Sequence, residues 1–185
     1  LDTLVKVIIN KKGKYMNIFA LDNCAIKSAT MQHDKHVVKM VLESAQMLCS
    51  AFEKEHNPPY KRAYYNHPCT KWARESFGNY TWLLLHALVL SSEYYRRYDK
   101  IHASRKVIEW CEENKKNLWF RTKEMTPFAQ AMPEEYKNED SVQAYRDYYI
   151  GTKLNGNPKW TNRKTPSIFK PYLLINAWYF SESIN

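Results

Sequence analysis

The densest group of chemically capable side chains in this sequence runs from His33 to Glu43. These eleven residues hold two histidines, two lysines, an aspartate and a glutamate. Residues three, four and seven apart share one face of a helix, so His36, Lys39 and Glu43 are predicted to line one side for two turns. A carboxylate beside cations and titratable imidazoles suits acid–base and electrostatic catalysis. The alternative is the solvated face of an ordinary amphipathic helix.

Three other segments carry candidate functional residues. The sequence Asn66-His67-Pro68 is either part of a site or a turn that caps the following helix. Residues 158–164 place three cations around Trp160, which suits a phosphate backbone and a stacked base, although a solvated tail is the alternative. We predict catalytic roles for Glu43, His36, Lys39 and His67. The predicted nucleic-acid contacts are His33, Lys35, Arg62, Asn66, Arg96, Arg97, Lys159, Trp160, Arg163 and Lys164.

We predict neither a metal site nor a cofactor. His33, His36, His67 and Cys69 would make four ligands in principle, but the first two are three residues apart rather than the four that zinc-binding helices favour. The sequence also lacks a second Cys/His pair at zinc-finger spacing. It has only 4 glycines and neither of the glycine-rich phosphate-binding motifs.

Apolar periodicity predicts the elements that position these residues. Apolar residues spaced by three or four predict long helices over 28–54 and 70–100, a third over 105–117, and a short one that Asp140 or Ser141 caps. Residues 16–21 form a short apolar run that suggests an extended segment or a minor strand. The tail from residue 155 is predicted to be irregular as far as 173–180. We therefore expect an all-α fold, a single compact helical domain spanning 16–185 with two long helices.

Composition indicates the class of partner. The 185 residues carry a net charge of +9 and 15% aromatic side chains, a combination that favours a polyanionic partner such as double-stranded DNA. The four cysteines are irregularly spaced and predict free thiols in a reducing compartment, which with the absence of a signal peptide favours the cytoplasm. The sequence has no apolar run long enough to span a bilayer, and we expect a monomer.

The first fifteen residues have an unusual origin in our interpretation. Back-translation of residues 11–16 with A-rich codons gives AAGGA a few bases before an ATG, which is the pattern of a bacterial ribosome-binding site. We therefore expect Met16 to be the natural start and residues 1–15 to be a translated leader outside the domain.

The order of these features resembles the small all-α pyrimidine-dimer DNA glycosylases of phage and bacteria, the endonuclease V type. In that family a strand-like start leads into a helix that bears the catalytic Glu. Bacterial members then have an Asn-His-Pro loop before a second long helix that ends in a basic pair. Here these features are similar to residues 16–19, Glu43, residues 66–68 and Arg96-Arg97, and residues 158–160 are similar to a Pro–Trp segment of the phage enzymes. The resemblance covers most of residues 16–169.

The resemblance implies a DNA glycosylase that removes a damaged or modified base, with AP-lyase activity if an imine forms. Glu43 would stabilise positive charge at the sugar C1′ or orient the nucleophile. The family's nucleophile is the α-amine of a small residue exposed after Met removal, a position that Asn17 holds here. Leu42 stands where the family has Arg, and a desolvated Lys39 is a second source of an amine. The alternatives are a non-catalytic nucleic-acid-binding phage accessory protein and an enzyme on free nucleotides.

Overall fold

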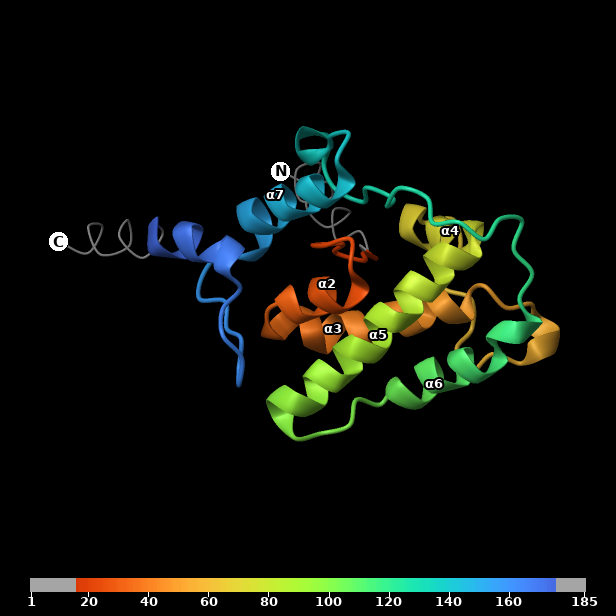
Figure 1. Ribbon diagram of the computed structural model, residues 1–185. Coiled ribbons are helices and arrows are strands. Elements are labelled where there is room, and N and C mark those ends of the chain that lie inside the picture. The colour runs from red at the N-terminus through yellow and green to blue at the C-terminus, as the bar shows by residue number, and fades with distance from the viewer. Residues whose placement is uncertain (1–15, 176–185) are drawn as a thin grey trace, which may run out of the picture.

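A computed structural model describes residues 16–175, and these form an all-α fold as expected. Figure 1 shows its α-helices, which are α2 (Ala25–Met31), α3 (Asp34–Cys49), α4 (Pro68–Glu75), α5 (Phe77–Tyr98), α6 (Arg105–Asn114) and α7 (Ser141–Lys153). Single 3-10 turns lie at Lys54–His56, Lys115–Asn117, Glu134–Tyr136 and Ser167–Phe169. Residues 170–175 are helical. Asp140, one of the two residues predicted to cap α7, does so through its side chain.

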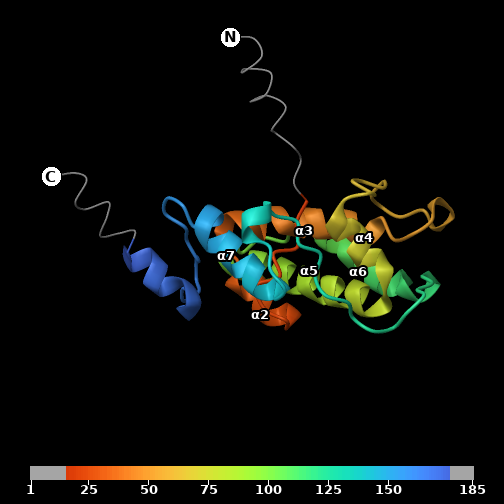
Figure 2. The same cartoon turned by 90° about the horizontal axis from the view of Figure 1, so that it is seen from above.

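Helix α5 is the centre of the fold. It packs against α2, α3, α4 and α6, and the two views show it crossing the body with α3 along one side (Figures 1 and 2). The predicted apolar stripe of α3 is buried completely, with Val37, Val41, Ala45 and Leu48 inaccessible to solvent. This burial holds α3 in place and turns its other face outward.

The predicted helix over 28–54 is wrong as a single element, because the chain breaks it at Gln32 and His33. Both residues have extended backbone angles. The main-chain N–H of His33 donates to the hydroxyl of Tyr149 at 3.0 Å, and that of Asp34 donates to the carbonyl of Lys159 at 2.9 Å. Distant segments therefore supply the acceptors that a continuous helix would have supplied.

The predicted helix over 70–100 is also split, into α4 and α5, at Ser76. Ser76 caps α5 through its side chain, which accepts a hydrogen bond from the main chain of Asn79. The N–H of Phe77 donates to the carbonyl of Thr122, and an isolated parallel bridge joins Ser76 to Thr122. Apolar periodicity continues across both breaks, so only the tertiary partners reveal them.

The predicted strand at the start is absent, because residues 16–21 run as an irregular, buried segment. Phe19 has a positive φ of 40°. The hydroxyl of Ser28 accepts from the N–H of Leu21 and donates to the carbonyl of Phe19, at 3.0 Å each. A side chain therefore satisfies main-chain groups that strand pairing would otherwise satisfy.

Some predictions fall partly or wholly outside the described residues. The proposed leader, residues 1–15, lies outside them, and so does most of 173–180. The four cysteines are free thiols, as predicted, and only Cys24 is exposed. Within residues 16–175 no helix has the length and apolarity needed to cross a membrane.

Candidate active site

The face of α3 that was predicted to carry His36, Lys39 and Glu43 holds an ion pair. Lys39 and Glu43 make an ion pair at 2.9 Å, one helical turn apart. Glu43 is only 8% exposed, whereas the side chain of Lys39 is 58% exposed. The carboxylate is therefore enclosed by the protein and its cation faces solvent, which differs from a fully solvated ion pair.

Glu43 has a second partner in the main chain of Asn17. The nitrogen of Asn17 donates to Oε2 of Glu43 at 3.1 Å. The Asn17 side chain fixes this direction, because its Oδ1 accepts from the next two main-chain N–H groups at 2.8 and 2.9 Å. Its Nδ2 donates to the carbonyl of Ala131 at 2.9 Å. The main-chain nitrogen of Asn17 therefore points at the carboxylate of Glu43.

Burial dominates the electrostatics of Glu43. Desolvation raises the pKa of the Glu43 carboxyl above its usual value, although the Lys39 ammonium and the Asn17 N–H oppose this. Lys39 offsets only part of the cost of burial, because its side chain is exposed to water, which screens its charge.

His36 lies on the same stripe and is held by aromatic contacts. Its ring stacks on Phe19 with centroids 4.4 Å apart and planes 14° apart. Its Nδ1 is 2.9 Å from the hydroxyl of Tyr149. Burial, followed by the charges of His33, Lys153 and Lys39, lowers the pKa of His36 to about 2. The imidazole is therefore neutral at physiological pH and acts through hydrogen bonds rather than as an imidazolium acid.

His67 caps α4, which is one of the two roles that the sequence left open. Its Nδ1 accepts the N–H of Cys69 at 3.2 Å and caps α4, and burial lowers its pKa. The residue also lines a groove of about 610 Å³, whose other wall includes Tyr148 and Lys153. The groove reaches the site through Ala131, the acceptor of Asn17. Among the described residues, no hydrogen bond or ion pair joins His67 to Glu43.

A second, basic hollow of about 300 Å³ lies beside the first. Lys35 and Lys159, both exposed, line it together with His33 and Lys153. Lys153 lines both hollows, so the two are neighbours on the surface. The structure thereby brings together the predicted contacts Lys35 and Lys159, which are far apart in the sequence.

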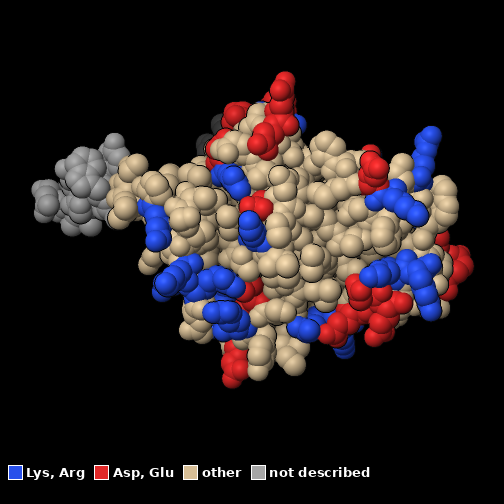
Figure 3. Space-filling view, viewed as in Figure 1, with Lys and Arg blue, Asp and Glu red and all other residues tan. Residues whose placement is uncertain are grey.

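The predicted basic contacts at the end of α5 gather in a third hollow. Arg96, Arg163 and Lys164 line a space of about 530 Å³ together with Asn162. Figure 3 shows Lys and Arg side chains concentrated where the C-terminal segment lies, while the rest of that face mixes both charges. Arg163 also binds Glu93, so Arg96 and Lys164 are its more available cations.

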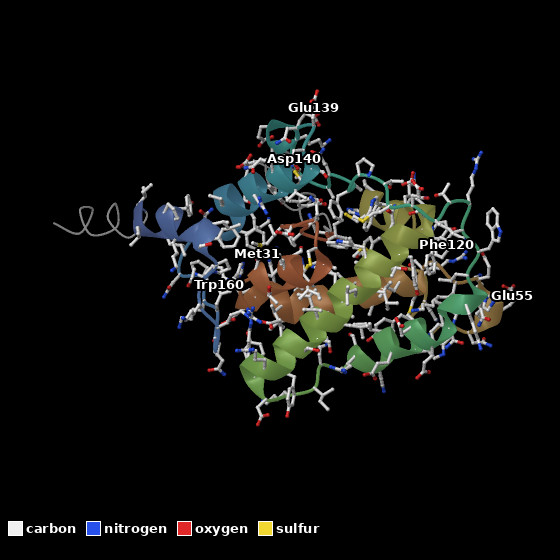
Figure 4. The ribbon with its side chains drawn as sticks, viewed as in Figure 1. Met31, Glu55, Phe120, Glu139, Asp140 and Trp160 are labelled. Carbon is white, nitrogen blue, oxygen red and sulfur yellow. The ribbon has the colours of Figure 1, made fainter. Side chains whose placement is uncertain are left out.

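Two predicted nucleic-acid contacts are contradicted by burial. Arg97 is 3% exposed, and its guanidinium donates to Asp34 and Glu93, each at 3.0 Å. Trp160 is 6% exposed and donates to the carbonyl of Met31 at 2.9 Å, as their adjacent positions in Figure 4 illustrate. Neither side chain can reach a phosphate or stack on a base without leaving the core. The Arg97 guanidinium instead joins α5 to Asp34 at the start of α3, and Trp160 attaches the C-terminal segment to the end of α2. His33 is 4% exposed and is covered in the same way.

The loop before α4 carries the remaining predicted contacts. Arg62 binds Glu53 at 2.7 Å and lies 4.7 Å over the ring of Tyr65, while Asn66 is exposed. Arg74 lies 3.5 Å over the same ring. This loop is a basic and aromatic surface that ends at His67.

The structure does not support Lys39 as a desolvated amine, because most of its side chain is in water. A nucleophilic lysine requires burial or a neighbouring cation that favours the neutral form.

His33 and His36 have ring centroids 4.4 Å apart. Even so, residues 16–175 contain no group of three or more His, Cys, Asp or Glu side chains arranged to hold a metal ion.

Sequence reasoning overlooked two residues of this site, Tyr149 and Lys153. Tyr149 and Lys153 are four residues apart on α7, so they share a face of that helix. That spacing was visible in the sequence, but nothing local indicated that Tyr149 on α7 reaches His36 on α3. Asn17 was indicated only by the family resemblance, and its hydrogen bond to Glu43 through the main-chain nitrogen could not be read from the sequence.

Comparison with known protein families gives a match over the first part of the described chain. The family model described as pyrimidine dimer DNA glycosylase matches residues 16–106, which begin beside Asn17 and include Glu43 and His67. The match confirms the resemblance found in the sequence and supports a DNA glycosylase-type function at the level of the family. No curated protein and no solved structure matches the chain.

Proposed function

We propose that this protein is a DNA glycosylase that removes a damaged or modified base from double-stranded DNA, with AP-lyase activity. The observation that carries the proposal is the 3.1 Å hydrogen bond from the main-chain nitrogen of Asn17 to Glu43. In the active form Asn17 is the first residue, so that this nitrogen is an α-amine held beside a buried carboxylate. Residues 1–15 are then a leader, and Met16 is removed.

The chemistry follows from this pair. The α-amine attacks the sugar C1′, a C1′–N bond forms, and the bond from C1′ to the base breaks. The departing base takes one proton from the amine. The bond from C1′ to the ring oxygen then breaks, the ring oxygen takes the second proton, and a C1′=N imine remains. Glu43 stabilises the cationic character at C1′ and orients the amine. His36, being neutral, positions a base or sugar oxygen by hydrogen bonding.

The surface around the site supplies the grip on DNA. Lys35, Lys153 and Lys159 form the basic hollow next to the stripe, and Arg96 and Lys164 extend it toward the end of α5. Such cations neutralise phosphates and release counterions. Removing the target nucleotide from the stack is easiest for a distorted or unpaired base. None of the steps proposed above uses a cofactor.

The first test replaces Glu43 with Gln, which keeps the shape and removes the charge. The chain beginning at Asn17 is incubated with ultraviolet-damaged and base-modified duplexes, and abasic sites and nicks are counted. We expect Glu43→Gln to lower the rate by about 100-fold or more, as for loss of one electrostatic stabiliser, with DNA affinity unchanged. If the parent chain binds DNA but leaves every duplex intact, it is a binding protein and the proposal fails.

The second test identifies the amine. Borohydride reduces an imine to a stable protein–DNA adduct, which a denaturing gel separates from free DNA. We expect adducts from the chain that begins at Asn17, and none from the chain that retains residues 1–16. Equal trapping of both forms would assign the amine to a lysine, and Lys39→Met in the full chain would then identify or exclude Lys39.

A further inference from the structure

Tyr149 connects His36 to the backbone at the break between α2 and α3. Its hydroxyl oxygen lies 3.0 Å from the main-chain nitrogen of His33 and 2.9 Å from Nδ1 of His36. The side chain is fully buried on α7, with its ring stacked on Phe169 and edge-on to Phe19. The hydroxyl therefore cannot turn to water for a partner.

The hydrogen-bonding capacity of each group then fixes the position of one proton. The main-chain N–H of His33 can only donate, so the hydroxyl oxygen of Tyr149 accepts from it. The hydroxyl hydrogen needs an acceptor, because an unpaired buried donor is unfavourable. Among the described residues, Nδ1 of His36 is the acceptor within hydrogen-bonding distance. Nδ1 must therefore be unprotonated, and the neutral ring carries its proton on Nε2.

We infer that Tyr149 is a positioning residue that holds His36 in the Nε2–H tautomer and so presents a fixed neutral donor two helical turns from Glu43 on α3. The opposite tautomer would direct two N–H groups at one oxygen and leave the Tyr149 hydrogen unpaired. The stack on Phe19 restrains rotation of the ring, so Nε2 is the ring atom left to contact a substrate acceptor. A carbonyl of a base, a sugar oxygen or a phosphate oxygen has the matching chemistry.

The burial of the site supports a single protonation state. The low pKa of His36, about 2, means that the ring does not become an imidazolium as the pH varies around neutrality. Two positive side chains, Lys39 and Lys153, and the ring of His33 all act in this direction. The donor is thus constant over the working range, whereas an ordinary surface histidine changes charge there.

The test is nitrogen NMR of the imidazoles in the full chain labelled with ¹⁵N-histidine, with His36→Gln used to assign the His36 signals. We expect Nδ1 of His36 to give the signal of an unprotonated nitrogen and Nε2 that of a protonated one, unchanged from pH 5 to pH 8. Tyr149→Phe keeps the ring but removes the hydroxyl, so a measurable Nδ1–H fraction should appear. A protonated Nδ1 in the parent chain would overturn the inference.

Tyr145→Phe is the matched control. Tyr145 is also fully buried on α7 and packs against Phe19, but its hydroxyl donates to Ala129 at 2.6 Å instead of to His36. We expect it to leave the His36 signals as they are, and an equal change in both variants would show a merely structural effect.

The catalytic reading of the tautomer rests on the proposed function, and there Tyr149→Phe should lower kcat about 10-fold with little change in KM, as for loss of one hydrogen bond. The NMR result holds or fails independently of any activity on DNA.

Discussion

Two carboxylate–cation pairs in this protein share one helical spacing but lie in opposite surroundings. Lys39 and Glu43 are four residues apart on α3, and Glu93 and Arg97 are four apart on α5. The first pair has a side chain that is 58% exposed, whereas both side chains of the second are almost completely buried. Spacing alone therefore does not distinguish a candidate site from an internal support.

The number of partners explains the difference. Glu93 binds Arg97 and Arg163, and Arg97 also binds Asp34, so every charge in this network faces an opposite one. Burial alone would raise the pKa of Glu93, but the two guanidiniums outweigh it and the pKa is lowered. Glu43 has one exposed cation and one main-chain N–H, so burial prevails and its pKa is raised. An incompletely compensated carboxylate is what a reaction that develops positive charge requires.

The largest expected difference between the pairs is in stability. Arg97→Met should lower the free energy of unfolding by about 3–5 kcal/mol, because it leaves buried carboxylates without their cation. Lys39→Met should lower it by at most about 1 kcal/mol, since an exposed partner contributes little. Urea unfolding followed by circular dichroism measures both. Equal losses would mean that the exposed pair also supports the fold.

The outcome for Arg97 shows what the sequence can and cannot predict. The all-α class, the buried stripe of α3 and the cap at Asp140 were predicted correctly, because periodicity and capping are local properties. Arg97 follows Arg96 directly in the sequence, yet one is buried and the other exposed. That distinction depends on Asp34 and Glu93 meeting at one point, which no local pattern encodes.

The candidate site likewise combines features that the sequence predicted with features that it missed. His36, Lys39 and Glu43 were placed on one face by spacing alone, and the structure confirms that they share this face. The breaks at His33 and Ser76 were missed, because Tyr149 and Thr122 stabilise them from distant parts of the chain. Trp160 was predicted to stack on a base, since a tryptophan among cations looks the same in sequence whether its indole faces the core or the solvent.

The second prediction compares how the stability contributed by Glu43 and by Glu93 depends on pH. Because the folded pKa of Glu43 is raised, ionisation of Glu43 lowers stability as pH rises from about the ordinary value of 4.5 through the folded pKa. Because the pKa of Glu93 is lowered, its contribution is present above 4.5 and is lost as pH falls through the folded pKa. Relative to the parent, Glu43→Gln should therefore become more stable as the pH rises above 4.5. Glu93→Gln should become less stable as the pH rises toward 4.5, and it should keep that deficit at higher pH.

Urea unfolding of the parent, Glu43→Gln and Glu93→Gln at several pH values gives the difference in the free energy of unfolding between each variant and the parent. Burial lowers the pKa of His33 to about 4 and of His86 to about 3, which makes the fold itself sensitive to acid. These histidines titrate in the parent and in both variants, so their contribution is common to all three. Differences of the same sign for the two variants would contradict the opposite pKa directions of Glu43 and Glu93.

The smallest expected effect concerns DNA affinity and separates exposed from buried cations. The logarithm of the affinity should fall linearly with the logarithm of salt concentration, with a slope set by the number of phosphates neutralised. Lys35→Ala and Lys159→Ala should each reduce the slope by about 1, because both lysines line the basic hollow. Lys116→Ala removes the same charge near the end of α6, away from the C-terminal segment (Figure 1), and should leave the slope unchanged. Arg97→Met, measured at a temperature where it is folded, should also leave it unchanged, because a guanidinium held by Asp34 and Glu93 has no counterion to release. A slope that responds equally to all four changes would show that DNA binding follows net charge, and the assignment of a DNA-binding surface beside Glu43 would then be wrong.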